Sequence, residues 1–175
     1  MFKFKCTACG QWHEGMPTFG DSAPLYYYAI PVQEREDRCV LGTDTCIVDQ
    51  EHFFIRGCLE IPVHGEAEPF SWGIWVSLSR DHFNAFVASL EMKHRSHIGP
   101  FFGWLSAEFP FYPSTENLKT LAHLRDDGLR PYIELEPTDH PIAVEQRNGF
   151  DVARVAEFYA YYERRELSPR QRDFE

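Results

Sequence analysis

Two stretches of the chain alternate between apolar side chains and polar or small ones, and they constrain the fold more than any other feature. The alternation runs over 52–63 and again over 70–79, with a polar turn at 64–69 between them. A period of two places alternate side chains on opposite faces of a β-strand. The pattern therefore predicts an antiparallel hairpin whose buried face includes Ile55, Leu59, Ile61, Trp72, Ile74 and Val76.

The expected register of this hairpin pairs Ile61 with Trp72 and Leu59 with Ile74. A slip by one residue would turn every apolar side chain to the wrong face, so the hydrophobic pattern specifies the faces strongly. Further elements are expected on both sides. A strand is predicted at 26–30, a helical turn at 34–38, a helix at 79–93, a second hairpin with strands at 118–124 and 129–135, and two helices starting at 139 and 151.

These elements follow one another without a βαβ rhythm, which predicts an α+β fold. We expect an antiparallel sheet with helices packed on one face and a Cys-containing N-terminal loop region. A chain of 175 residues fits one domain. We assign this domain to 1–165, with a turn-rich, zinc-stabilised segment at 1–44, and interpret 166–175 as a polar tail.

Charge and hydropathy exclude several classes of function. Lys and Arg total 17 against 27 Asp and Glu, a net charge of −10, which opposes nucleic-acid binding on electrostatic grounds and suits a basic protein partner. No apolar run is long enough to span a bilayer, and the first five residues lack the apolar core of a secretory signal. We therefore expect a cytoplasmic protein that does not associate with membranes.

The cysteines suggest a metal site. Cys6-x-x-Cys9-Gly10 has the spacing of a zinc knuckle, in which glycine permits the turn that directs two thiolates at one ion. A structural zinc needs four ligands. We expect Cys46 as the third and His13 as the fourth, with Cys58 as the alternative fourth ligand. A redox CxxC pair and two unconnected loop thiols are the competing interpretations, and no nucleotide-cofactor motif is present.

The outward face of the predicted sheet is a second candidate site. Arg56 and Glu60 share one face of a strand, Trp75 belongs to the same face of the neighbouring strand, and Glu134 and Glu136 share a face of a later strand. An arginine, an indole and several carboxylates are suited to binding a polar ligand or activating water. The alternative is a solvated sheet face, which antiparallel sheets commonly have.

Asp139 and His140 precede Pro141 at the start of a predicted helix. A carboxylate beside a histidine can orient a catalytic base. The same position, just before a proline, also suits a helix cap, and we favour the cap.

Several motifs resemble one uncharacterised bacterial family, the domain of unknown function numbered twenty-one ninety-nine. They are CxxCGxxH at 6–13, D-x-C at 44–46, HFFIRGCLEIP at 52–62, WGxWVSLS at 72–79, GWL at 103–105 and IELEPTDHP at 133–141. The resemblance covers about residues 6–160 and implies a bacterial origin and a single domain, but no reaction.

Two functions are consistent with these features. The first is a non-catalytic cytosolic binding or interaction domain with a structural zinc. The alternative is a small hydrolase-like enzyme that uses the Arg- and Glu-lined sheet face.

Overall fold

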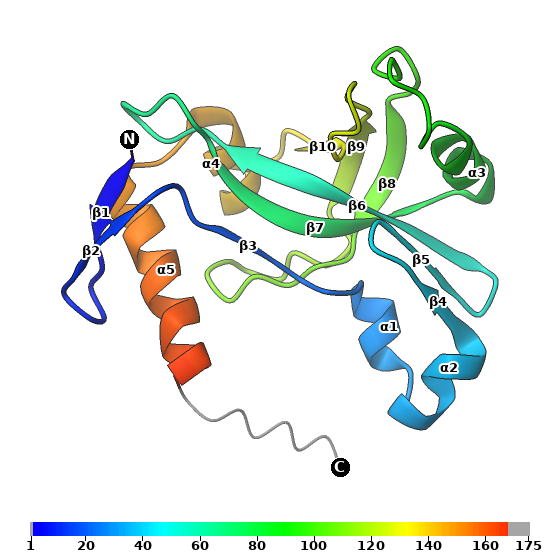
Figure 1. Cartoon of the computed structure of the whole chain (residues 1–175), viewed down its shortest axis with the longest axis horizontal. Helices are drawn as coiled ribbons and strands as arrows, with labels where there is room; N and C mark the ends of the chain where they lie inside the picture. The colour runs from blue at the N-terminus through cyan, green and yellow to red at the C-terminus, as the bar shows by residue number, and fades with distance from the viewer. Residues whose placement is uncertain (1, 168–175) are drawn as a thin grey trace.

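The predicted hairpin is present as β6 (His52–Ile61) and β7 (Phe70–Leu78), the two longest strands of the fold (Figure 1). The computed structural model describes residues 2–167. All six predicted core side chains of the hairpin have 0% exposure, so this prediction is confirmed. Arg56, Cys58 and Glu60 alternate with them on the opposite face and are half-buried.

The register of the hairpin differs from the prediction by two residues. Ile61 pairs with Phe70 and Leu59 with Trp72. The shift is even, so every apolar side chain keeps its face. The cause lies at the turn, where Val63 leaves the hairpin and forms a parallel bridge with Phe150 instead.

The sheet does not stay open as expected but closes into a five-stranded barrel. β7 pairs with β8 (Phe101–Leu105), then β9 (Lys119–His123) and β10 (Tyr132–Leu135) follow, and β10 returns to β6. The successive pairs are antiparallel, whereas the closing pair β10–β6 is parallel. An odd number of strands in a meander requires one such parallel pair. The α+β class is thus confirmed, but the simple antiparallel sheet with helices on one face is wrong.

Gly57 permits the closure of the barrel. A Cβ atom at this position would lie 2.5 Å from Cγ1 of Ile133 and 2.9 Å from the carbonyl oxygen of Pro131. The same carbonyl accepts a hydrogen bond from the Cys58 backbone N–H at 2.8 Å. Only a residue without a side chain lets β10 approach β6 this closely.

Short strands extend the sheet beyond the barrel. β3 (Thr18–Gly20) runs parallel to β7, β5 (Thr45–Val48) lies beside β6, and β4 (Cys39–Leu41) forms the edge. β1 (Lys3–Lys5) and β2 (Trp12–Glu14) form a separate two-stranded hairpin. In Figure 1 this hairpin lies beside α5, away from β8 and α3.

The observed helices begin close to their predicted first residues, but their ends agree less well with the prediction. The side chain of Ser79 caps α3 (Arg80–Ala88) as predicted, but the helix ends five residues before the expected boundary at Lys93. α4 (Pro141–Asn148) ends at Gly149, whose φ is +76°. α5 (Val152–Leu167) follows, and the predicted tail at 166–175 lies outside the described residues from 168 onward.

The segment before β4 is helical. α1 (Leu25–Ala29) replaces the strand predicted at 26–30, whereas α2 (Arg35–Arg38) confirms the predicted helical turn and follows a 3-10 turn at Val32–Glu34. The run of three tyrosines at 26–28 does not form the expected strand. Tyr26 instead packs from a helical turn against the rings of His52 and Phe54, with centroids at 4.9 and 5.2 Å.

Two hydrophobic clusters hold the fold together. The larger fills the barrel and extends under α4 and α5. The smaller lies on the outer face of β6 and β7, for which we expected either a binding site or a solvated surface. It consists of Ile30, Cys46, Val48, Phe54 and Trp75.

Candidate metal centre

The β1–β2 hairpin forms the knuckle that the CxxC spacing predicts. The connection between the strands turns back at Gly10, whose φ is +72°, a conformation that glycine adopts at little cost. The backbone N–H of Cys6 donates to the carbonyl of Gln11 at 2.9 Å, and the N–H of Gly10 donates to the carbonyl of Cys6 at 3.0 Å. The N–H of Ala8 also donates to the Cys6 sulfur at 3.3 Å. The loop therefore holds the thiol groups in one place.

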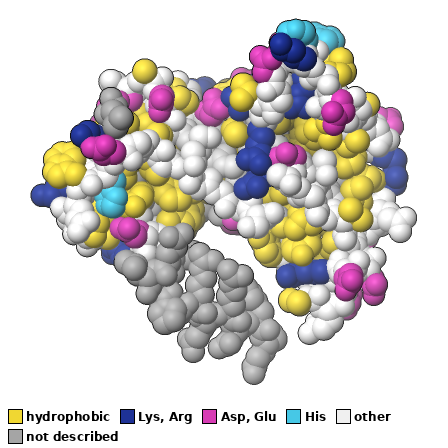
Figure 2. Space-filling model, viewed as in Figure 1, with side chains coloured by type: hydrophobic (Ala, Val, Ile, Leu, Met, Phe, Trp, Pro, Cys, Tyr) yellow, Lys and Arg dark blue, Asp and Glu magenta, His cyan; other side chains and the backbone are white. Residues whose placement is uncertain are grey.

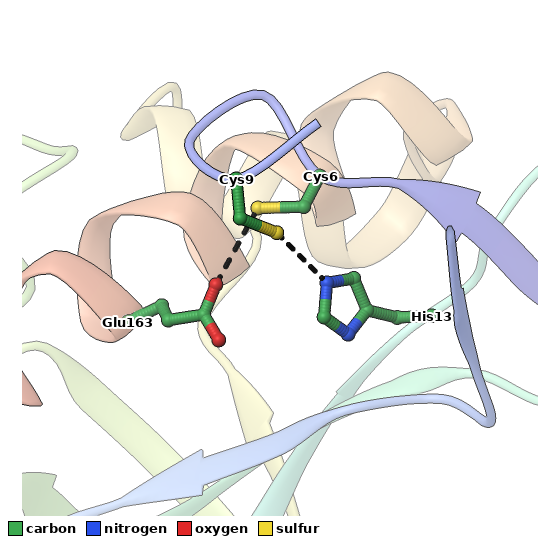
Figure 3. A group of neighbouring side chains, drawn as sticks. All are labelled: Cys6, Cys9, His13 and Glu163. Atoms are coloured by element: carbon green, nitrogen blue, oxygen red, sulfur yellow. Dashed lines mark hydrogen bonds between the residues drawn. The ribbon is translucent and has the colours of Figure 1, made fainter. Parts of the chain in front are cut away.

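Four side chains converge at this knuckle (Figure 3). The Cys6 thiol donates to Oε2 of Glu163 at 3.7 Å, and Sγ of Cys9 lies 3.3 Å from Nε2 of His13. One ligand atom from each of the four lies within 4.8 Å of those of the other three. Cys6, Cys9 and His13 come from the hairpin, whereas Glu163 reaches in from α5.

Aromatic packing orients the histidine. The His13 ring stacks on Phe4, its partner across the hairpin, with centroids 5.5 Å apart. Its other neighbour is Tyr159 of α5, whose ring centroid lies 4.5 Å away. Tyr159 and Glu163 are one helical turn apart, so the helix that packs on the histidine also carries the carboxylate.

The surroundings of the cluster raise the pKa values of Cys9 and Tyr159. A hydrogen bond from the backbone of Gln11 lowers the pKa of Cys9, but desolvation, Cys6 and Glu163 outweigh it, and the net direction is upward. The pKa of Tyr159 is raised by burial and then by Glu163, Cys6 and Cys9. Neighbouring acidic groups repel one another when they are deprotonated. A cation bound between them stabilises their deprotonated forms together.

Two of the separations between ligand atoms match those around a tetrahedral zinc ion. Bonds of about 2.3 Å to sulfur and about 2.0–2.1 Å to nitrogen or oxygen place tetrahedral ligand atoms about 3.3–3.8 Å apart. The Cys9–His13 and Cys6–Glu163 separations of 3.3 and 3.7 Å fall within this range. Cys6 is 1% exposed, while Cys9 is exposed. The donor set of two sulfurs, one imidazole and one carboxylate consists of ordinary zinc ligands.

The structure does not bring Cys46 or Cys58 to this cluster. Cys46 lies on β5 with 0% exposure, packed in the smaller hydrophobic cluster against Trp75. Burial, followed by the charge of Cys39, raises its pKa to about 12. Cys58 faces outward in the middle of β6, opposite Gly73. The expectation of Cys46 as third ligand is therefore corrected, because the β5–β6 pairing holds this residue in a different part of the molecule.

Glu163 is the fourth residue of the cluster, and the sequence pattern did not indicate it. Its only local signal is the four-residue spacing to Tyr159, which is common on any helix. The contact between Glu163 and Cys6 spans 157 positions of the chain and depends on how α5 docks against β1. Local sequence patterns do not predict how this helix packs against the strand.

The outward sheet face is less open than expected. Arg56 and Trp75 are directly paired across β6 and β7, but Trp75 is fully buried and donates from Nε1 to the carbonyl of Asp21 at 3.1 Å. Arg56 lies 5.9 Å from the Trp75 ring. Burial raises the pKa of Asp21, and the charge of Arg56 lowers it by a smaller amount. Figure 2 shows Lys and Arg side chains gathered over the middle of β6.

Each carboxylate of this face has a basic partner. Glu60 forms an ion pair with Arg125 at 2.6 Å, and Glu134 lies 2.7 Å from Nε2 of His123. Glu136 lies 3.5 Å from Nζ of Lys119. The structure therefore holds these carboxylates in separate pairs.

His140 has the role of a helix cap. Its Nδ1 accepts a hydrogen bond from the Ile142 N–H at 3.4 Å, at the first turn of α4. This geometry supports the cap interpretation of the Asp139–His140 pair.

The geometry defines a small barrel protein with a CxxC knuckle and a four-residue metal-type cluster. The chain belongs to a family of uncharacterised proteins conserved in bacteria, DUF2199, which it matches over residues 5–150. The match includes Cys6, Cys9 and His13 and ends before Glu163. No curated protein and no solved structure matches the chain. Among the described residues, no helix has the length and apolar character needed to cross a bilayer.

Proposed function

We propose that this protein is a non-catalytic, cytosolic binding domain whose N-terminal hairpin is fixed by a structural zinc ion. The observation that carries the proposal is the convergence of four ligand atoms, from Cys6, Cys9, His13 and Glu163, within 4.8 Å of one another. The half-buried carboxylate of Glu163 lies beside two thiols, and among the described residues no Lys or Arg forms an ion pair with it. A zinc ion supplies the missing positive charge.

The zinc ion would join the two ends of the described chain. β1 and β2 have three residues each, and an isolated two-stranded hairpin of this size is marginal in water. Its contact with the rest of the protein depends on α5, through Phe4 and Tyr159 with ring centroids 5.0 Å apart. Because metal affinity for a folded site adds to folding free energy, zinc would stabilise this docking.

Two features favour binding over hydrolysis. The carboxylates of the sheet face are paired individually, with Glu60 on Arg125 and Glu134 on His123, which leaves none of them as an isolated base. The net charge of −10 favours a basic protein partner through long-range attraction. An enzyme that used the Arg56 face would instead need a carboxylate released from its pair.

Elemental analysis of protein purified without chelator tests the proposal. We expect about one equivalent of zinc for the unaltered protein and less than about a tenth for Cys6→Ser. Cys46→Ser is the matched control, because it removes a buried thiol outside the cluster. Glu163→Gln should retain the knuckle but release zinc to a competing chelator faster than the unaltered protein.

Amide hydrogen exchange tests whether the proposed zinc ion stabilises the N-terminal hairpin. Chelation should increase amide exchange in 2–14, the hairpin, and leave 52–78, the centre of the barrel, protected. The proposal would be contradicted if the protein contained no zinc either after purification or after anaerobic incubation with zinc. Equal zinc loss in Cys6→Ser and Cys46→Ser would contradict it as well.

A further inference from the structure

Two hollows are lined in part by the exposed indole of Trp104 on β8. In Figure 1, β8 lies away from the β1–β2 hairpin that carries the metal-type cluster. The volumes of the hollows are about 400 and 350 Å³, and both are lined by Ser77, Leu78 and Trp104. The two hollows therefore adjoin at these residues, and together they are called the Trp104 groove. The first hollow also contains Tyr26, Glu51, His52 and Asn117, and the second also contains His82 and Phe102.

The hollows lie where β7 ends at Leu78 beside β8. The two strands pair only at Val76–Leu105 and Ser77–Trp104. Phe102 and Trp104 alternate with the buried residues of β8, so both rings face outward. They are 43% and 41% exposed and meet edge to face with centroids 5.2 Å apart. Large rings held at this exposure on a rigid strand are typical of binding surfaces.

The lining selects the charge of a ligand. Among the described residues that line the two hollows, Glu51 is the only one with a formal charge at neutral pH. A Lys or Arg side chain of a ligand would find the Glu51 carboxylate there. The nearby guanidinium of Arg80, 4.6 Å from the ring of the lining residue Phe53, already donates a hydrogen bond to the Gln50 carbonyl at 2.8 Å. The net charge of −10 acts in the same direction over a longer range.

The shape selects the conformation of a ligand. A polyproline II segment has three residues per turn and rises about 3.1 Å per residue, so its side chains can fill adjacent hollows on either side of a ring. Its backbone carbonyls have no internal hydrogen bonds and accept bonds from groups such as the Asn117 amide and the Ser77 hydroxyl. Aromatic-walled grooves are a recurrent way to bind such segments at low entropic cost.

We propose that this groove binds a proline-rich segment of a partner protein, in the polyproline II conformation, with a basic side chain beside Glu51. The inference rests on the proposed role as a binding domain and names the partner class, but it uses a surface separate from the zinc cluster. Trp104 would be the central contact, because rings at the centre of an interface carry most of its binding energy.

Calorimetric titration with a synthetic peptide that contains proline pairs and one terminal arginine tests the proposal. Trp104→Ala should weaken binding at least about tenfold. Trp12→Ala is the matched control, since Trp12 is 69% exposed on the β1–β2 hairpin, and it should leave the affinity unchanged. Replacing the prolines of the peptide by alanine should abolish binding.

Glu51→Lys provides a second variant that does not touch the barrel core, because Glu51 is exposed at the turn before β6. It should weaken binding of the arginine peptide and have little effect on a peptide with glutamine in that position. Absence of peptide binding by the unaltered protein, or binding that Trp104→Ala leaves unchanged, would overturn the inference. Binding of a neutral oligosaccharide in the groove without peptide binding would also overturn it.

Zinc content measured on the same samples separates the two proposals. Trp104→Ala and Glu51→Lys should both retain zinc, because neither residue belongs to the cluster. Peptide binding by a protein that contains no zinc would refute the metal proposal alone.

Discussion

Replacing Gly57 by alanine should strain the closure of the barrel. The added methyl group would lie 2.5 Å from Cγ1 and 2.6 Å from Cδ1 of Ile133, which is 0% exposed, and 2.9 Å from the carbonyl oxygen of Pro131. Neither neighbour can move freely, because one is a core side chain and the other is hydrogen-bonded backbone. Overpacking of this kind costs about 1–3 kcal/mol.

Gly73→Ala is the matched control for this change. Gly73 lies on β7 in the same hairpin, and its nearest neighbour would be Nη2 of Arg56 at 3.5 Å, an ordinary contact. Both substitutions reduce the entropy of the unfolded chain by the same amount. The difference between them therefore isolates the clash, and we expect Gly57→Ala to be less stable by about 1–3 kcal/mol. For a chain of this size that corresponds to a melting temperature lower by about 2–12 °C.

Urea unfolding followed by tryptophan fluorescence measures the free energies of unfolding. A double-mutant cycle with Ile133→Ala adds a second criterion, because removing Cγ1 and Cδ1 of Ile133 leaves space for the new methyl group. The two changes should couple favourably by about 0.5–3 kcal/mol. Equal stability of Gly57→Ala and Gly73→Ala, together with no coupling to Ile133→Ala, would show that β10 does not close on β6.

Three further predictions concern single side chains. A hydrogen bond to the Asn148 carbonyl, and then one to Asp151, raise the pKa of His64 above its usual value of about 6.5. Its contribution to stability is therefore complete below about pH 6.5 and is lost as pH rises through the folded-state pKa, so thermal melts of the unaltered protein and His64→Gln should converge at alkaline pH. His140→Ala should lower the free energy of urea unfolding by about 0.5–2 kcal/mol through loss of the α4 cap, and an unchanged value would reject the cap. In chelated protein at pH 8, iodoacetamide should modify the exposed Cys9 and spare Cys46, whose pKa burial raises to about 12, as peptide mass mapping would show.

The local pattern was sufficient for the faces of the main hairpin and for the starts of the helices. Alternation assigned Leu59 and Trp72 to the core, because a period of two determines the face of a strand residue whatever its partner is. It did not determine which residues pair, because a shift of two preserves every face. The register depends on Val63, which leaves the hairpin to bridge with Phe150.

The CxxC spacing likewise predicted a knuckle with Cys6, Cys9 and His13, since all three lie within one short loop and hairpin. The spacing could not identify Glu163, which lies far away in the sequence. Cys46 was chosen for its chemistry, but β5 holds it in an apolar cluster with Trp75, and α5 supplies Glu163 instead. Sequence patterns report interactions over a few residues, whereas barrel closure and helix docking depend on the packing of whole surfaces. For this reason only the tertiary structure decided the closing strand pair, the fourth residue of the cluster and the groove at Trp104.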